Sequence, residues 1–359
     1  MRSKTIGALA ALTAGVLLLA ACGSRNDDGG GTDTGSVADV AAIQEAMPDV
    51  NGDGNVVVGI MSPGDTGDGG YYESFVTEAR AFADEKGWTL NIVDKINTSD
   101  AVAQARNLCR QNVDMIAVGA SELKDALSAT SDESCANVAF YISSGDGVEE
   151  NPQVAQSQDR ANESIIAAGY SAGLLMQRTG AKTAGFIGGP EVDFSTRAAN
   201  AYAAGVKQVV PDANVLTTYT GDSEDSGKAR EAATAQMAQG AAVIYPYLGG
   251  ATDSVASLAN ERNVAVLTPG SDRCDSTAPS YDVSVLFAPG LYFGETLNQF
   301  NDGTLELGAI KVYHLGVDRY PTVKICQPEG AEEAQLNEFI AGIGAGDIKP
   351  DDLIAASVS

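Results

Sequence analysis

Residues 56–86 read VVVGIMSPGDTGDGGYYESFVTEARAFADEK, and this stretch combines a strand pattern, a turn pattern and a helix pattern. Residues 56–61 form a short apolar run, which is typical of a strand buried on both faces. Residues 62–70 contain a Pro and four Gly, which favour a turn. From Tyr71 the apolar residues recur with helical spacing. The stretch therefore predicts the strand, loop and helix that repeat in a parallel α/β sheet.

The alternation of strand and helix runs through the chain in two series. Apolar or β-branched runs begin at residues 56, 89, 115 and 137, and again at residues 183, 214, 241 and 264. The starts are separated by 33, 26 and 22 residues in the first series and by 31, 27 and 23 in the second. This duplication predicts two α/β lobes, each a parallel sheet with helices on both faces. Segments late in the chain are expected to cross between the lobes.

The first residues, MRSKTIGALAALTAGVLLLAACGS, have the pattern of a secretory signal peptide. Arg2 and Lys4 precede an apolar stretch that ends in small residues. That stretch is shorter than the roughly 20 residues that span a bilayer. Residues 19–22, LAAC, resemble a bacterial lipobox, which implies cleavage before Cys22 and a lipid on its sulfur. We therefore expect a secreted protein that is held by lipid at the outer face of the cell membrane.

These patterns divide the chain into a leader, a stalk and two lobes. The stalk is expected to be flexible because its first part, GSRNDDGGGTDTGS, has no large apolar residue. The predicted boundaries are a signal peptide at residues 1–21, a lipid-anchored stalk at 22–54, a first lobe at 55–148 with 275–304, and a second lobe at 149–274 with 305–359.

The charge of the chain excludes one class of partner. The chain has 48 acidic and 22 basic residues and a formal net charge of −26. An acidic excess of this size repels phosphate backbones and anionic lipid surfaces. We therefore expect no nucleic-acid partner.

Four cysteines remain besides Cys22, and an even number in an oxidising compartment predicts disulfides. Four cysteines allow three pairings. We favour Cys109 with Cys135 and Cys274 with Cys326. Cys109 and Cys135 lie near the ends of two successive predicted helices, on either side of one strand, which would place them on one face of a sheet.

No stretch carries a specific motif for a cofactor, a metal or catalysis. The loop at residues 62–70 lacks the Lys of a phosphate-binding loop, and its two Asp residues would repel an anion. Residues 49–60 begin like a calcium-binding loop, but Ile60 stands where the bidentate Glu is needed, which favours a plain turn. His314 is the single histidine, which argues against Ser-His and Cys-His enzymes. We expect His314 to be a half-buried strand residue.

The second series contains four motifs that together, by their order and spacing, are typical of one protein family. They are GFIGG at residues 185–189, AYAAGVK at 201–207, DSGKAREAA at 225–233 and QGAAVIYPYLGGATDSV at 239–255. Over about residues 56–349 the chain resembles the basic membrane protein family of lipoproteins. These are solute-binding components of ABC transporters and include purine nucleoside receptors. The resemblance implies a type I periplasmic-binding fold, solute capture in an interlobe cleft and delivery to a membrane permease. We expect a monomer.

The site is expected where the loops follow the strands, because ligands of open parallel sheets bind beyond the carboxyl ends of the strands. The loop at residues 62–74 would then line the cleft. The family's nucleoside receptors stack the base between aromatic rings and hold the ribose with carboxylates. The ligand-binding residues predicted from the loop and the resemblance are Asp68, Tyr71, Tyr72, Glu73, Ser143, Tyr247, Gly249, Gly250 and Asp272.

The chain departs from the family's nucleoside contacts at several positions. Tyr71 keeps the aromatic residue of the first loop, whereas Ser223 stands where the second aromatic falls. Ser143 and Gly270 replace two aspartates, and the expected Lys falls near residues 290–291. The carboxylates that could take over are Asp68, Asp193 and Asp275. The cleft stays aromatic and mildly acidic, which suits a neutral or cationic solute with a ring or hydroxyls.

The sequence thus predicts a lipid-anchored, extracytoplasmic solute-binding protein that delivers a nucleoside or related compound to an ABC importer. We expect no enzymatic activity, no cofactor and no metal. Two alternatives stay open, namely the ligand-binding module of a sensory system and, least favoured, a secreted hydrolase that uses paired carboxylates.

Overall fold

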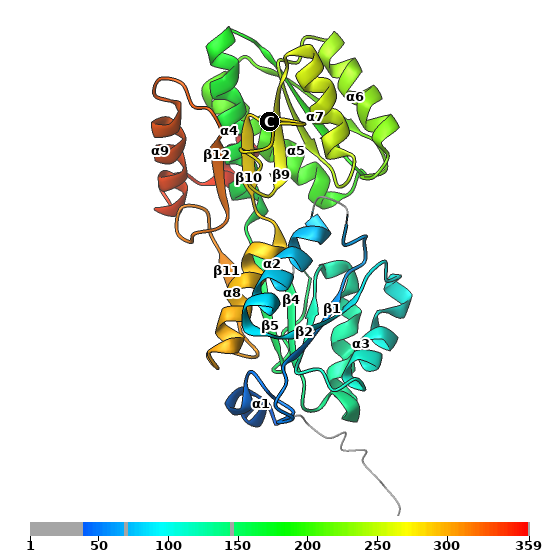
Figure 1. The fold of residues 1–359 in the computed structure, drawn as a ribbon. Helices are drawn as coiled ribbons and strands as arrows, with labels where there is room; N and C mark the ends of the chain where they lie inside the picture. Colours follow the sequence, from blue (N-terminus) through cyan, green and yellow to red (C-terminus); the bar gives the residue numbers. More distant parts are fainter. Residues whose placement is uncertain (1–38, 68–70, 144–146, 358–359) are drawn as a thin grey trace, which may run out of the picture. The chain divides into compact units, whose positions relative to one another are not determined.

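The computed structural model describes residues 39–67, 71–143 and 147–357, and the described part contains two six-stranded sheets (Figure 1). We call each sheet with its helices a lobe. The predicted signal peptide, Cys22 and Asp68 lie outside the described residues.

The first sheet has the strand order β11-β5-β4-β3-β1-β2, and all its neighbouring strands are parallel. Its strands are β1 (Val57–Met61), β2 (Thr89–Val93), β3 (Met115–Val118), β4 (Ala139–Ser143), β5 (Val154–Asp159) and β11 (Ile310–Tyr313). β1, β3 and β4 are buried on both faces, as expected for short apolar runs in the middle of a sheet.

Helices cover both faces of the first sheet. The apolar side chains of α2 (Tyr71–Lys86), α8 (Pro289–Asn301) and α1 (Val40–Ala46) pack on one face, and α2 and α8 lie side by side (Figure 1). The other face is covered by α3 (Ala101–Cys109) and the 3₁₀ helix η2 (Ser121–Ser131). Two short 3₁₀ helices, η1 (Thr98–Asp100) and η3 (Glu133–Cys135), flank this layer.

The second sheet has the order β12-β10-β9-β8-β6-β7. Its strands are β6 (Thr183–Gly188), β7 (Asn214–Tyr219), β8 (Val243–Tyr247), β9 (Ala265–Gly270), β10 (Val283–Leu286) and β12 (Thr322–Ile325). β12 is antiparallel to β10, and the other neighbours are parallel.

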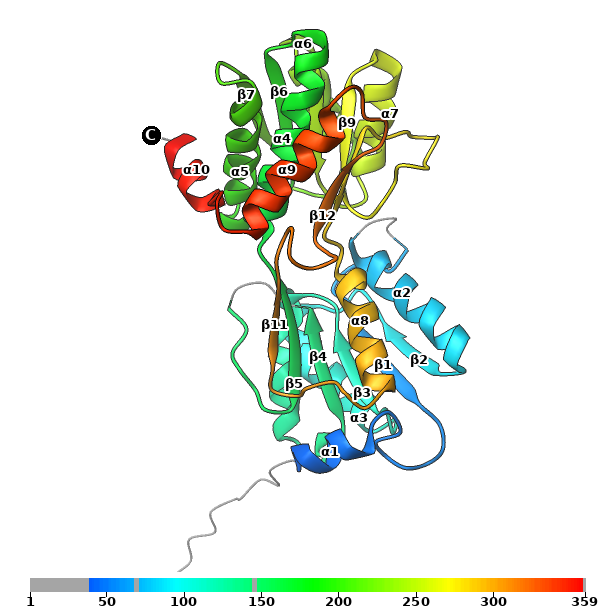
Figure 2. The same ribbon diagram turned by 90° about the vertical axis from the view of Figure 1, so that its left-hand side faces the viewer.

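Helices also cover both faces of the second sheet. One face carries α4 (Ala161–Thr179), α5 (Asp193–Val209), α9 (Glu332–Gly344) and α10 (Pro350–Ser357). Figure 2 shows α9 beside α4 and α10 beside α5. The other face carries α6 (Ser226–Ala238) and α7 (Thr252–Arg262). The predicted pair of α/β lobes is confirmed.

The predicted lobe boundaries differ from the structure at three places. β5 pairs with β4, so residues 149–159 belong to the first lobe and not to the second. β10 pairs with β9, which places residues 275–286 in the second lobe. β11 pairs with β5, so residues 305–313 belong to the first lobe. The chain crosses between the lobes after β5, after β10 and after β11. Periodicity does not tell which of the two sheets a strand joins.

The predicted stalk extends too far, because residues 40–54 are folded onto the first lobe. α1 begins after Asp39, whose carboxylate accepts a hydrogen bond from the Ala42 amide (3.2 Å). Ile43 is 1% exposed and Met47 is 8% exposed, and both belong to the core beneath the first sheet. Ile43 lies in α1, and Met47 follows the last residue of this helix. With the partly buried Val50, these side chains dock the segment onto the first lobe.

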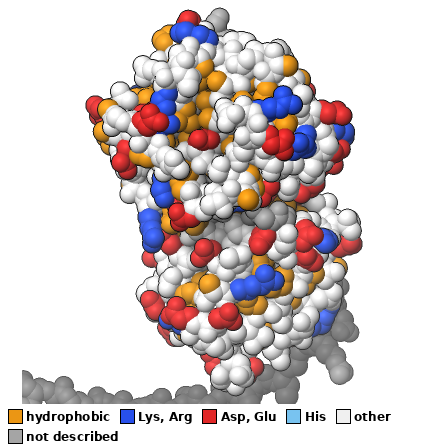
Figure 3. Space-filling view, turned by 45° about the horizontal axis from the view of Figure 1, so that its top comes forward, with side chains coloured by type: hydrophobic (Ala, Val, Ile, Leu, Met, Phe, Trp, Pro, Cys, Tyr) orange, Lys and Arg blue, Asp and Glu red, His pale blue; other side chains and the backbone are white. Residues whose placement is uncertain are grey.

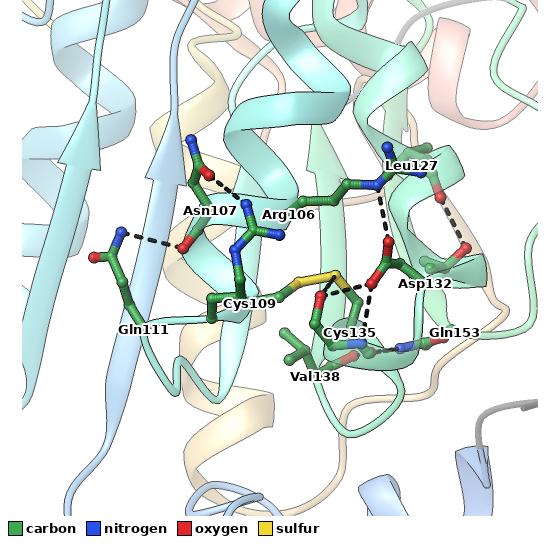
Figure 4. The surroundings of a disulfide bond; sticks show 12 residues. Arg106, Asn107, Cys109, Gln111, Leu127, Asp132, Cys135, Val138 and Gln153 are labelled. Carbon is green, nitrogen blue, oxygen red and sulfur yellow. Dashed lines mark hydrogen bonds and ion pairs between the residues drawn. A yellow bond between two sulfur atoms is a disulfide. The ribbon is translucent and has the colours of Figure 1, made fainter.

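Both favoured disulfide pairings are present. Cys109 at the end of α3 is bonded to Cys135 in η3, as Figure 4 shows. Next to this bond the Gln153 side chain donates hydrogen bonds to the carbonyl oxygens of Cys135 and Val138, both at 2.7 Å. The second bond joins Cys274, after β9, to Cys326, after β12. Each disulfide closes within one lobe, so neither restrains the movement of one lobe against the other.

An ion pair ties the end of α4 to the start of α9. Nε of Arg178 donates to Oε1 of Glu332 at 2.6 Å, and the same guanidinium donates to the Gln327 carbonyl oxygen at 2.9 Å. The Glu332 side chain is 9% exposed. The hydrogen bond from Arg178 lowers the pKa of Glu332, although burial opposes the shift. This stabilisation is therefore complete above the ordinary pKa of a Glu and is lost as the pH falls through the lowered value.

We expect Arg178→Ala to reduce the free energy of unfolding by about 1–3 kcal/mol at neutral pH, because it leaves a buried carboxylate without its partner. Urea unfolding followed by circular dichroism measures this change. Lys182→Ala is the control, since it breaks a pair with Asp212 whose side chains are 59% and 69% exposed, and such pairs contribute less than about 1 kcal/mol. Equal losses in the two variants would refute a special role for Arg178.

Candidate functional site

The carboxyl ends of the strands present polar and aromatic side chains in both lobes. Ser143 and Asp159 are the last residues of β4 and β5, and Tyr247 is the last residue of β8. Tyr71 opens α2, the helix that follows β1. Ligands bind beyond this edge in open parallel sheets, so these four residues are placed where a solute is expected.

Tyr71 has protein groups around it, but about a third of its surface is exposed to solvent. Its ring meets the Tyr72 ring edge-on, with the centroids 5.5 Å apart, and 36% of its surface is exposed. Removal from bulk water raises the pKa of Tyr71 well above its ordinary value, and the charges of Asp159 and Glu122 raise it further. A large exposed ring in such surroundings is free to contact a ligand.

Tyr247 reaches the same region from the second lobe. Its ring packs against Phe186 (centroids 5.7 Å apart) and Phe287 (6.1 Å). Burial raises its pKa, and so does the negative charge of Asp159. Tyr247 in turn contributes to the raised pKa of Tyr71. Each lobe therefore presents a tyrosine at the carboxyl edge of its sheet.

Asp159 is the residue of this region that the sequence analysis missed. It ends β5, immediately before the chain crosses to α4, and is half-buried. The Tyr292 hydroxyl donates a hydrogen bond to Oδ2 of Asp159 at 3.4 Å. Burial, with a smaller contribution from the charge of Glu163, raises the pKa of Asp159 to about 6. The signal was available, because Asp159 is the last residue of VAQSQD, but this segment was not recognised as a strand. We call Tyr71, Asp159, Tyr247 and Tyr292 the carboxyl-end site.

Three other predicted residues lie close to Tyr71 in the chain or in the sheet. The Tyr72 hydroxyl donates to Oε1 of Glu122 at 3.3 Å, and the Tyr72 ring lies against Gly64, where a Cβ atom would come within 2.3 Å of it. Glu73 is in the first turn of α2 and is half-buried. Ser143 is 6% exposed. Tyr72 therefore holds the glycine-rich loop against the helix, whatever else it contacts.

The predicted residues of the second lobe other than Tyr247 are engaged by protein groups. Oε2 of Glu224 accepts the Gly250 amide at 3.0 Å, and a Cβ atom on Gly249 would lie 2.1 Å from Oε1 of the same side chain. Asp272 forms an ion pair with Lys324 at 3.1 Å and accepts the Cys274 amide at 3.1 Å. A solute at these positions would compete with the partners that these groups already have.

Phe194 supplies exposed aromatic surface at the carboxyl edge of the second sheet. It lies in the first turn of α5, the helix that follows β6, and is 57% exposed. Ser223, which stands at the position of the family's second aromatic, packs against Gly189 at the end of the same strand. Phe194 is thus a second stacking candidate that the sequence analysis did not identify.

His314 follows β11 at a crossing between the lobes. Its Nδ1 lies 3.1 Å from Oε1 of Glu163, and the Leu315 amide donates to Oε2 of the same carboxylate at 2.9 Å. The His314 amide donates to Asp318 at 2.9 Å. These contacts join the start of α4 to the last crossing segment, so His314 helps to connect two of the crossings.

The calcium-like loop is a turn in which the side chains bind backbone. The Asp49 carboxylate accepts the amides of Asp53 (3.1 Å) and Gly54 (2.9 Å), and Asn51 accepts the Asp53 amide at 2.9 Å. In the part of the chain that the structure describes, no three His, Cys, Asp or Glu residues gather in a way that could hold a metal ion. Nor does any helix of that part have the length and apolarity to cross a membrane.

Comparison with known families supplies the decisive observation. Residues 55–316, well over half of the chain, match the family Bmp, described as "ABC transporter substrate-binding protein PnrA-like". The chain belongs to the Bmp family. The Bmp-family protein is therefore a substrate-binding protein of the ABC transporter class, which acts outside the cytoplasm, binds a small solute and passes it to a permease.

Individual proteins are also similar to this chain in sequence or in fold. The Bmp-family chain is 24% identical over 270 residues to the CD4+ T-cell-stimulating antigen of Listeria monocytogenes, a match that covers 71% of this chain and 68% of that protein. A solute-binding protein of an ABC transporter system from Conexibacter woesei has a TM-score of 0.66 at 20% identity, with 82% of this chain and 98% of that chain covered. A 5-methylthioribose transporter solute-binding protein from Thermotoga lettingae has a TM-score of 0.54 at 13% identity, with 87% and 98% covered. The predicted type I periplasmic-binding fold is confirmed.

Proposed function

We propose that this Bmp-family protein captures a nucleoside, or a related small solute with a ring and hydroxyls, between the carboxyl ends of its two sheets and delivers it to an ABC importer. The observation that carries the proposal is that each lobe has a tyrosine at the carboxyl edge of its sheet, because Tyr71 opens the helix after β1 and Tyr247 ends β8. A solute that touches both lobes favours the closed arrangement by its differential affinity, and that arrangement is what a permease would recognise.

The 5-methylthioribose complex in the same fold class supports a ring-and-hydroxyl solute. A base stacks well on an exposed tyrosine, and Asp159 supplies an acceptor for hydroxyl or amine hydrogens. We also propose that the mature chain begins at Cys22 and is held by lipid at the membrane, which rests on the signal-like pattern of residues 1–22 and on the family.

The solute can be identified with a thermal-shift screen of a soluble form beginning near residue 36. Nucleosides, free bases, sugars, polyols and amino acids should be tested at about millimolar concentration. A ligand at 100 times its dissociation constant stabilises a protein by about 2.7 kcal/mol, which raises the melting temperature by a few degrees at this size. If none of these classes shifts the melting temperature, the proposed solute class is wrong.

Tyr71→Ala should weaken binding of the solute found in that screen by about tenfold or more, because stacking on an aromatic ring contributes about 1–3 kcal/mol per base. Isothermal titration calorimetry measures the affinity. Phe82→Ala is the matched control, since it removes a ring from the same helix, where Phe82 packs against Trp88 at 5.0 Å. The proposal fails if the two variants bind the solute equally well.

A further inference from the structure

Asp159 is a carboxylate without a countercharge. Among the described residues, no Lys or Arg contributes to its pKa, and the neighbouring Arg160 is exposed. Its hydrogen-bond partner is the hydroxyl of Tyr292. The Tyr292 residue is 3% exposed, so it holds the carboxylate from the buried side. A half-buried carboxylate normally acquires a cationic partner.

Some acidic groups of this protein have cationic partners. On the face shown in Figure 3, the acidic side chains are spread over both lobes and mixed with Lys and Arg. Lys182 pairs with Asp212 at 2.6 Å, and Lys95 pairs with Asp65 at 2.8 Å. Because the chain has 48 acidic and only 22 basic residues, many exposed carboxylates have no cation beside them. Asp159 differs from those in being half-buried.

The charges that act on the carboxyl-end site are negative. Glu122 and Asp159 both raise the pKa of Tyr71, and Glu163 raises that of Asp159. Glu163 itself is satisfied, because its two oxygens are taken by His314 and the Leu315 amide. The residue that pairs with Asp159 in the sheet is Tyr313 of β11, and its hydroxyl is bonded to Glu295 at 3.0 Å. None of these groups neutralises Asp159.

The aromatic rings beside Asp159 favour the same kind of ligand. Tyr71 is open to solvent and Tyr247 is half-buried, and both feel the charge of Asp159. A cation is attracted to the face of an aromatic ring, more strongly where water is excluded. An ammonium group has three donors and no acceptor, which matches a carboxylate whose side-chain partner is one tyrosine hydroxyl.

We infer that the solute carries a protonated amine, which Asp159 binds at the carboxyl end of β5, where the Tyr292 hydroxyl holds the carboxylate. This inference rests on the proposed function and names the class of solute more narrowly, as an amine-bearing compound with a ring or hydroxyls, such as an amino sugar or an amino nucleoside. Closure of the lobes around a neutral solute would remove water from an unpaired carboxylate, which is unfavourable. Closure around an amine would exchange that water for an ion pair.

The test uses solutes that differ only in the amine. The pairs are glucosamine and glucose, and 5′-amino-5′-deoxyadenosine and adenosine. Calorimetric titrations near pH 7 compare the native protein with Asp159→Asn. Asp84→Asn is the matched control, because it removes one negative charge from an exposed position on α2 of the same lobe.

We expect the amine of at least one pair to bind at least about 10-fold more tightly than its neutral partner. Asp159→Asn should weaken that amine by at least about 30-fold, as for other truncated buried charge pairs, while Asp84→Asn leaves it unchanged. Since the pKa of Asp159 is about 6 in the free protein, affinity of the native protein for the amine should fall as the pH drops below about 6. Asp159→Asn should abolish this dependence.

Two results would overturn the inference. If a neutral solute binds as tightly as its amine partner and Asp159→Asn does not weaken it, the proposed function stands and the amine requirement is wrong. If none of the amines or neutral partners binds, and the broader screen is also silent, the proposed function fails with it.

Discussion

Asp159→Asn is expected to make the solute-free protein more stable at pH 8, by roughly 3 kcal/mol in the free energy of unfolding. The pKa of Asp159 is about 6 in the folded protein and about 3.9 in an unfolded chain, and each unit of difference corresponds to about 1.4 kcal/mol. Because the folded pKa is the higher one, the folded state holds the proton more tightly. The charged form of Asp159 is therefore a destabilising feature of the empty protein.

The direction of the pKa shift sets the pH range in which Asp159→Asn and the native protein differ in stability. Below about pH 4 the carboxyl group is protonated in both states, and native protein and variant should be equally stable. The difference should grow between about pH 4 and about pH 6 and remain constant above. Urea unfolding at a series of pH values measures it, with Asp84→Asn as the control for the loss of one surface charge. A variant that is less stable than the native protein at pH 8 would show that Asp159 has a structural role and would remove the reason to assign it to solute binding.

Gly205→Ala is expected to reduce the free energy of unfolding by about 3 kcal/mol or more. α4 and α5 touch through their backbones, and a Cβ atom on Gly205 would lie 2.0 Å from the carbonyl oxygen of Ile166. The reciprocal position, Gly169, is as close to the Tyr202 carbonyl oxygen, at 2.1 Å. Backbone cannot move aside as a flexible side chain can, so the helices must separate and open the core between them.

Gly294→Ala is the matched control for this prediction. Gly294 lies inside α8, and a Cβ atom there would meet the Glu78 carboxylate at an ordinary 3.7 Å. Alanine at such a site favours the helix by about 0.5–1 kcal/mol. Comparing the free energies of unfolding of the two variants therefore distinguishes the effect of close packing between helices from the effect of helix propensity. Similar stabilities of the two variants would show that the α4–α5 contact tolerates a side chain.

The strands in the middle of each sheet could be predicted from sequence, because they are continuous apolar runs between turn signals. The duplication of spacing gave the two lobes, and the cysteine positions gave both disulfides. The sheets that β5, β10 and β11 join could not be assigned, since strand pairing depends on contacts distant in sequence. α1 was missed because it is a helix of only 7 residues with one buried side chain, Ile43, which is too little to show a helical period.

The candidate site was predictable in part for the same reason. Tyr71 was found because it follows a recognised strand and a glycine-rich loop. Asp159 was missed because its strand, β5, was not recognised. Asp159 is a candidate for ligand binding because it has no cation beside it, and the sequence does not reveal this. Gly249, Gly250 and Asp272 were expected to face the solute, and nothing in the sequence indicated that Glu224 and Lys324 contact them. Binding of solute by these residues and by Asp68 stays a prediction.

The most direct test of the account is a crystal structure of the soluble protein grown with the tightest solute from the thermal-shift screen. The account predicts that the solute lies between the two lobes, with its ring against Tyr71 or Tyr247 and a polar hydrogen directed at Asp159. A solute bound within one lobe, away from the carboxyl ends of the strands, would contradict it.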